Sequence, residues 1–148
     1  VLDKEYRHAV RFDTVFVDAP CSGTGTMRRH GEIPWRLTPQ ECDRNLPKLQ
    51  LAMLRAAADR VAPHGELIYA TCSVLRAENI GVVTAFLTSP QGEDFVPISV
   101  SDALRDAGGA YAAAAHDLAV CENADGLFQS HPTRDGFDGH FCARFVRK

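Results

Sequence analysis

The sequence lacks the segments that mark membrane and secreted proteins. It has no secretory signal peptide and no apolar run of the roughly 20 residues that cross a bilayer. The formal net charge is only −3, with 16 Lys and Arg against 19 Asp and Glu, so there is no strong overall attraction to nucleic acid. We therefore expect a cytoplasmic protein without a membrane partner, in which any contact with nucleic acid depends on a local basic patch.

Cysteine pairs with metal-ligand spacing are also missing. The chain has five cysteines but no CxxC motif, which argues against a structural zinc site. An odd number of cysteines without regular spacing argues against a disulfide framework. We predict reduced thiols and no metal site.

What is present favours one α/β domain. A chain of 148 residues with 45% hydrophobic residues can build a single core. The hydrophobic patterns predict these strands: 12–18, 66–71, 95–100 and 140–146. They predict helices from Thr38, broken or restarted at Pro47, and over 77–87, whereas 108–115 is predicted to be loop or disordered. This order indicates a parallel sheet that ends in an antiparallel edge pair.

The apolar side chains of the two predicted helices fall at helical spacing. In the first helix the expected buried face is formed by Leu46, Leu49, Met53, Ala57 and Val61. In the second it is formed by Ile80, Val83, Phe86 and Leu87.

Two cysteines follow predicted strands. Cys21 comes three residues after the strand 12–18, and Cys72 comes directly after the strand 66–71. In an open α/β sheet, ligands gather beyond the carboxyl ends of the strands. Two thiols there indicate covalent catalysis, although a free cysteine often packs as a small hydrophobic residue.

Other chemistries can be weighed against the spacing. A cysteine-dependent phosphatase places an arginine six residues after its cysteine, but Met27 occupies that position and Arg28 follows it. A cysteine protease needs a histidine partner, and no histidine here has a distinctive context. Asp18, at the same rim as Cys21, serves either to bind a ligand or to cap a turn.

The residues around the two cysteines resemble a known family. The segments are 18–25 (DAPCSGTG), 28–30 (RRH), 69–73 (YATCS), 78–79 (EN) and 134–144 (RDGFDGHFCAR). Together they resemble the Sun/Fmu family of RNA cytosine carbon-5 methyltransferases, most closely its bacterial small-subunit ribosomal RNA branch. His140 stands where a second aromatic residue is usual. The resemblance implies a Rossmann-like fold, S-adenosylmethionine as cofactor and ribosomal RNA as partner.

The resemblance also implies roles for individual residues. Cys72 is the nucleophile that attacks carbon 6 of cytosine, and Cys21 assists product release. Asp18 contacts the methyl donor and the target base, and Pro20 shapes the loop against the base. Glu78 and Asn79 steady the Cys72 loop, or serve as an ordinary first helical turn.

A basic stretch follows the first cysteine loop. Arg28, Arg29 and Arg36 are expected to pair with RNA phosphates, or else to lie on a solvated loop. Trp35 either stacks on a base or packs in the core. We favour packing, because large aromatic side chains are usually mostly buried.

Part of the family's pattern is missing before residue 12. The glycine-rich cofactor loop, the acidic residues for ribose and adenine, and the amino-terminal RNA-binding domain are not found. We therefore expect residues 1–148 to be the carboxyl-terminal part of a methyltransferase catalytic domain, with part of the Rossmann-like sheet, an incomplete cofactor site and little activity of its own. A sheet without its neighbouring strands exposes an edge that dimerisation can cover. The alternative is a non-catalytic fragment or interaction module.

Overall fold

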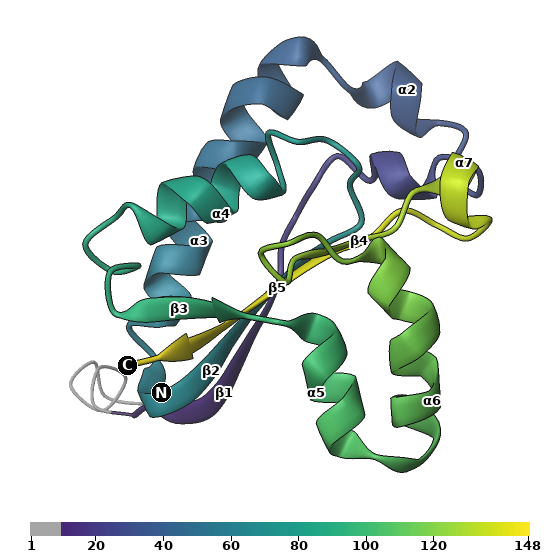
Figure 1. Cartoon of the computed structure of the whole chain (residues 1–148). Coiled ribbons are helices and arrows are strands. Elements are labelled where there is room, and N and C mark those ends of the chain that lie inside the picture. Colours follow the sequence, from purple (N-terminus) through teal and green to yellow (C-terminus); the bar gives the residue numbers. More distant parts are fainter. Residues whose placement is uncertain (1–9) are drawn as a thin grey trace.

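A computed structural model describes residues 10–148. Figure 1 shows one twisted sheet, with the helices α3 and α4 together on one side and the helical hairpin α5–α6 beyond the end of β3. The core lies between the sheet and α3 and α4, where Leu54 and Phe86 pack against Leu67, Tyr69 and other buried strand residues. The predicted α/β class is confirmed.

The sheet has the strand order β1-β2-β5-β3. The strands are β1 (Phe12–Asp18), β2 (Val61–Thr71), β3 (Phe95–Ile98), β4 (Phe128–Gln129) and β5 (Phe141–Arg147). β1 and β2 are parallel, whereas β5 is antiparallel to both β2 and β3, and β4 pairs with the first part of β5. The sheet is therefore mixed: β1 and β2 form a parallel pair as expected, but the antiparallel strand β5 lies inside the strand order, beside β2, and not only in an edge pair.

The second strand begins earlier than predicted. Residues 63–65 (PHG) have the composition of a turn, but they lie inside β2. Phe12 pairs with Val61 and Thr14 pairs with Glu66, so the register shifts at this point. His64 has a positive φ of 62°, which lets the strand bulge and continue.

The first long helix starts as its sequence indicates. The side-chain oxygen of Thr38 accepts a hydrogen bond from the Glu41 amide at 3.2 Å, as a capping threonine does. The chain then forms the π-helical turn η2 (Glu41–Asn45) and continues as α3 (Leu46–Ala58). Pro47 lies in the first turn of α3, where its missing N–H is not needed, so it marks the predicted restart.

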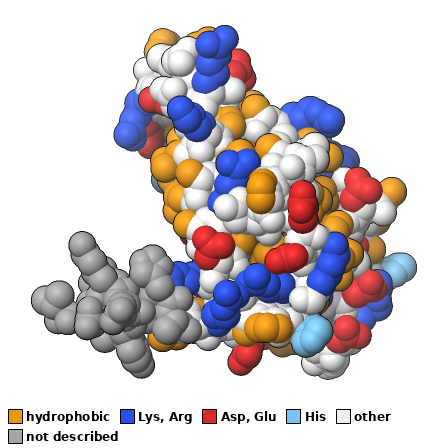
Figure 2. Space-filling view, turned by 90° about the vertical axis from the view of Figure 1, so that its left-hand side faces the viewer, with side chains coloured by type: hydrophobic (Ala, Val, Ile, Leu, Met, Phe, Trp, Pro, Cys, Tyr) orange, Lys and Arg blue, Asp and Glu red, His pale blue; other side chains and the backbone are white. Residues whose placement is uncertain are grey.

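The buried face of α3 differs from the prediction by about one residue. Leu49 is 49% exposed and Met53 is 36% exposed, whereas Gln50 and Leu54 are fully buried. Gln50 is drawn inward by polar partners described below, and this rotates the predicted apolar stripe partly into solvent. Figure 2 shows one face of the molecule on which hydrophobic side chains are exposed between charged ones.

Of the remaining helices, only α4 falls within a helix that the sequence predicted. They are α2 (Ile33–Arg36), α4 (Ile80–Leu87), α5 (Val100–Ala107), α6 (Gly109–Leu118), α7 (Pro132–Asp135) and the 3-10 turns η1 (Thr24–Thr26) and η3 (Ala119–Cys121). The prediction of a loop over 108–115 is wrong. Gly108 and Gly109 take positive φ and form the turn after α5, and the alanines that follow favour a helix.

One edge of the sheet has no partner strand within residues 10–148. β1 stands at the end of the strand order, and its Phe12 and Phe16 side chains are 52% and 59% exposed. An unpaired edge with exposed aromatic residues is the kind of surface that another chain covers. Dimerisation through this edge stays a prediction. Among the described helices, none is long and apolar enough to cross a membrane.

Candidate functional site

The two predicted cysteines lie together. Because β1 and β2 are parallel, the loops that follow them meet at one edge of the sheet. The Ala19 amide donates to the carbonyl of Ala70 at 2.9 Å, which aligns the two loops. The Sγ atoms of Cys21 and Cys72 are 3.2 Å apart and share a hydrogen bond.

The buried carboxylate of Glu78 forms hydrogen bonds with both cysteine loops. Glu78 is completely buried. It accepts hydrogen bonds from the Ser22 amide at 2.8 Å, the Gln50 side chain at 2.9 Å and the Ser73 hydroxyl at 3.1 Å. Gln50 also donates to the carbonyl of Pro20 at 2.9 Å. One side chain thus fixes the residues next to both thiols.

Hydroxyl and amide groups complete this polar network. The hydroxyls of Ser22, Thr24 and Ser73 are 3.1 Å from one another. Asn79 accepts from the Thr71 hydroxyl at 2.7 Å and donates to the carbonyl of Ser73 at 2.8 Å. The sequence-based expectation that Glu78 and Asn79 steady the Cys72 loop agrees with these contacts, although both residues precede α4 rather than lie in its first turn.

The environment of Cys21 keeps its thiol protonated. Burial and the hydrogen bond to Cys72 raise the pKa of Cys21 to about 12. Cys21 is therefore a thiol at neutral pH, and its proton can be shared with the sulfur of Cys72.

Asp18 and Pro20 lie at the open rim of the site. Both are exposed, and Asp18 pairs in register with Ala70, two residues before Cys72. A cavity of about 340 Å³ adjoins Cys21. It is lined by Cys21, Ser22, Gly23, His30, Glu32, Ile33, Arg36 and Leu37, so Arg36 and His30 bring basic groups next to the thiol.

The arginines of the basic stretch contact the segment before β5. Arg29 forms an ion pair with Asp138 at 2.5 Å, and Arg28 lies 3.6 Å from the same carboxylate. Arg28 also donates to the carbonyl of Gly136 at 3.2 Å. The expectation that Trp35 packs in the core is wrong, because the side chain is 89% exposed. The short helix α2 holds no buried residue, so it presents Trp35 to solvent.

Two glycines allow the chain to close over the Cys21 loop. The Gly139 amide donates to the carbonyl of Gly25, and the Gly25 amide donates to the carbonyl of Cys72, both at 2.9 Å. A Cβ atom on residue 25 would overlap the Gly139 carbonyl. The close approach explains why glycine stands at both positions, and it holds Gly139 against the Cys21 loop.

Sequence reasoning missed Gln50 and Asp138. Gln50 lies next to the predicted apolar stripe of its helix, and Asp138 lies within the segment 134–144 that resembles a family motif, but the sequence assigned no role to either side chain. Cys42, Cys121 and Cys142 lie apart from the thiol pair, and burial raises the pKa of each thiol. Residues 10–148 contain no cluster of potential ligands that could hold a metal ion.

Comparisons with known proteins agree with these features. Residues 2–146 match the family described as 16S rRNA methyltransferase RsmB/F. Ribosomal RNA small subunit methyltransferase B of Pasteurella multocida is 34% identical over 136 residues, which cover 92% of this chain and 26% of that protein. The protein of the same name from Salmonella arizonae is 46% identical over 77 residues, covering 52% of this chain and 18% of that protein.

Solved structures share the fold. The crystal structure of PH0851 has a TM-score of 0.69 at 27% identity and covers 90% of this chain and 26% of that one. A methyltransferase homolog from Pyrococcus horikoshii has a TM-score of 0.67 at 20% identity and covers 97% of this chain and 42% of that one. NSun6 from Pyrococcus horikoshii, solved with SFG, has a TM-score of 0.67 at 18% identity, covering 97% of this chain and 32% of that one.

The chain thus spans about a fifth to a quarter of the length of these two curated relatives. The family match nevertheless covers nearly all of its residues and includes both cysteine loops. The chain belongs to the RsmB/F family of 16S rRNA methyltransferases.

Proposed function

We propose that this chain carries the reactive thiols of an RNA methyltransferase that modifies carbon 5 of cytosine in ribosomal RNA. The observation that carries the proposal is the pair of Cys21 and Cys72 sulfurs, 3.2 Å apart beyond two parallel strands, in a chain of the RsmB/F family. Two thiols at one point suit covalent catalysis better than packing, because neither is fully buried.

Cys72 is the proposed nucleophile. Its thiolate attacks carbon 6 of the cytosine, a C–S bond forms, and the electron pair of the C5=C6 bond moves to make carbon 5 electron-rich. Carbon 5 then takes the methyl group. The raised pKa of Cys21 supports this assignment, because it makes Cys21 the poorer nucleophile of the two. The target base must leave its stack to reach the thiols.

Cys21 is the proposed releasing group. After methylation the proton on carbon 5 must leave and the C–S bond to Cys72 must break, which restores the ring and the Cys72 thiolate. One cause of the raised Cys21 pKa is its hydrogen bond to Cys72. When the Cys72 sulfur is bonded to carbon, that contribution weakens, so Cys21 ionises more readily at the step that needs a base.

Asp18 is the proposed contact to S-adenosylmethionine, the group that supplies the methyl. Its carboxylate is exposed at the carboxyl end of β1, where it can accept hydrogen bonds from a polar cofactor, so it fits one contact of such a site. We expect the other contacts to come from polypeptide outside residues 10–148. For that reason we expect this chain alone to bind the cofactor weakly and to have little activity.

Pro20, Arg28 and Arg29 are the proposed contacts to RNA. Pro20 is exposed beside Cys21, and both arginines are exposed, so they can reach a base and phosphates respectively. Their shared partner Asp138 holds the arginines in place. An RNA phosphate that binds Arg28 and Arg29 therefore competes with the carboxylate of Asp138 for the two arginines.

The test is a pair of variants of the protein that carries these residues. With RNA substrate and S-adenosylmethionine, Cys21→Ala should accumulate a covalent RNA adduct, visible as a band of reduced mobility on a denaturing gel. Cys72→Ala should form no adduct, and Cys42→Ala, a matched control, should turn over without accumulating one. An adduct that survives in Cys72→Ala and disappears in Cys21→Ala would reverse the two roles.

A further inference from the structure

A second cavity adjoins the loop that carries Cys72. Its volume is about 470 Å³, within the range of sites that bind small molecules. It is lined by Val74, Arg76, Ile80, Val120, Cys121, Glu122, Asn123, Leu127, Gln129, His131, Arg134 and Phe141. Neither thiol of the pair lines it, so it is separate from the cavity beside Cys21.

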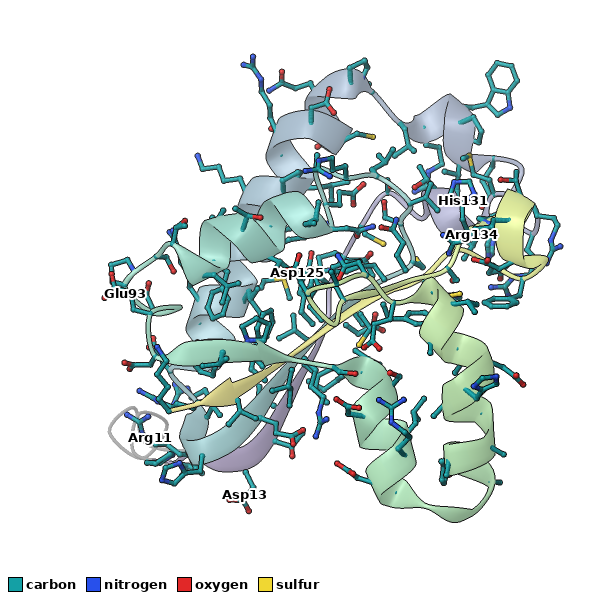
Figure 3. The ribbon with its side chains drawn as sticks, in the orientation of Figure 1. Arg11, Asp13, Glu93, Asp125, His131 and Arg134 are labelled. Carbon is teal, nitrogen blue, oxygen red and sulfur yellow. The ribbon has the colours of Figure 1, made fainter. Side chains whose placement is uncertain are left out.

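The lining of this cavity carries one arginine without an ion-pair partner and one that is already paired. Arg76 is exposed and takes part in no ion pair found within residues 10–148. Arg134 contacts Asp135 through Nε and Nη2, and Nη2 also donates to the carbonyl of Gln129 at 2.7 Å. Arg76 therefore supplies the uncompensated positive charge, and Arg134 can add a contact only through Nη1. Figure 3 shows Arg134 and His131 next to each other at α7.

The acidic residue in the lining already has its partners. The carboxylate of Glu122 accepts hydrogen bonds from the amides of Val100 and Ser101 and from the hydroxyls of Ser99 and Ser101. These bonds lower the pKa of Glu122 and direct its oxygens toward the start of α5. Glu122 is therefore negatively charged, and both of its carboxylate oxygens already accept hydrogen bonds from residues 99–101 at the start of α5.

The other part of the cavity is apolar. Leu127 and Phe141 are 3% and 2% exposed, and Val74 and Ile80 lie beside them. The side-chain amides of Asn123 and Gln129 also line the cavity, where the Asn123 oxygen accepts from the amides of Asp125 and Leu127 and its NH2 group can serve a ligand. A flat aromatic group with hydrogen-bonding edges and a negative charge at one end matches this arrangement. A nucleotide has these three properties.

We propose that this cavity binds a nucleotide of the substrate RNA next to the target cytosine, with its phosphate at Arg76 and Arg134 and its base on the apolar surface. The proposal rests on the proposed function. Arg76 follows Cys72 by four residues, which a chain spans in at most about 14 Å. A single RNA strand crosses that distance within a few nucleotides, so one strand can place its target at the thiols and a neighbour in the cavity.

The test measures RNA affinity by fluorescence anisotropy with a labelled single-stranded RNA that contains the target cytosine. Arg76→Ala should weaken binding about tenfold at low salt and reduce the salt dependence by one phosphate contact. Arg105→Ala, on the exposed surface of α5, is the matched control and should change affinity less than about twofold. Val120 is 76% exposed at the cavity, so Val120→Glu should weaken binding and Val120→Arg should strengthen it without a folding defect.

Three outcomes decide the proposal. Equal affinity of Arg76→Ala, Val120→Glu and the Arg105→Ala control would overturn it. Cytidine monophosphate that binds the cavity as tightly as the RNA would also overturn it, because the ligand would then be a free nucleotide. RNA binding that depends on Arg76 without any Cys72 adduct would support the cavity and contradict the proposed chemistry, so the two failures can be told apart.

Discussion

Replacing Glu78 should loosen both cysteine loops at once. Its carboxylate is completely buried and accepts hydrogen bonds from Ser22, Gln50 and Ser73. In Glu78→Ala the Ser22 amide loses this buried acceptor and Gln50 loses one of its two. Each unsatisfied group costs about 1–3 kcal/mol, so we expect a loss of about 4 kcal/mol in the free energy of unfolding.

Glutamine at the same position should cost less. Its oxygen can replace the carboxylate oxygen that accepts from Ser22 and Gln50, and its amide can donate to Ser73. What is lost is the charge on the acceptor, which is worth about 1 kcal/mol for each of the two bonds. We expect Glu78→Gln to lower the free energy of unfolding by about 2 kcal/mol, half the effect of alanine.

Urea unfolding followed by circular dichroism measures the loss of unfolding free energy in both variants, and thermal unfolding gives the matching shifts in melting temperature. For a chain of this size, 1 kcal/mol corresponds to a shift of about 2–4 °C in the melting temperature, so Glu78→Gln should melt about 4–8 °C lower and Glu78→Ala about 8–16 °C lower. Glu93→Gln, on the exposed surface, is the control and should stay within about 0.5 kcal/mol. If Glu78→Ala is as stable as this control, the network does not hold the loops and the reasoning is refuted.

Two further predictions concern the same site. Gly25→Ala should lower the free energy of unfolding by about 1–3 kcal/mol, because the new methyl group overlaps the carbonyl of Gly139. Gly31→Ala, where the structure leaves open space, should be neutral in the same urea titration, and equal loss in both variants would contradict the role of the contact. Alkylation of Cys21 by iodoacetamide, followed by mass spectrometry, should be slow at pH 8 and increase toward pH 12, because burial and the hydrogen bond to Cys72 raise its pKa to about 12. In Cys72→Ala the hydrogen bond is gone, so the alkylation profile should move to lower pH, and an unchanged profile would show that the bond has no influence.

The sequence predicted the strands that carry the site better than the helices. The runs at 12–18 and 66–71 are β-branched and apolar, and both are strands that place Cys21 and Cys72 at one edge. Such apolar runs predict strands without knowledge of their partners, although β1 proves to be a largely exposed edge strand and only β2 is buried at alternate positions. The bulge at His64 was not predictable in this way, because it depends on the register between β1 and β2.

The errors come from residues whose setting depends on distant partners. Gln50 is buried because it reaches Pro20 and Glu78, which lie far away in sequence. The glycine- and alanine-rich segment at 108–115 has the composition of a loop, yet alanine favours helix once two glycines have made the turn before it. Trp35 is exposed because α2 is too short to pack against the core.

The place of β5 in the sheet has a consequence for how the chain folds during synthesis. β5 lies between β2 and β3, yet it is the last of the five strands in sequence. A ribosome that adds about 5–20 residues per second needs about 3–14 seconds to proceed from Thr71 to Phe141. During that interval β1 and β2 can pair and bring the two thiols together. The other edge of β2 stays unpaired until β5 is synthesised. Asp138 and Gly139 are synthesised just before β5, so the arginines and the Cys21 loop gain these partners only after β1 and β2 have had time to pair.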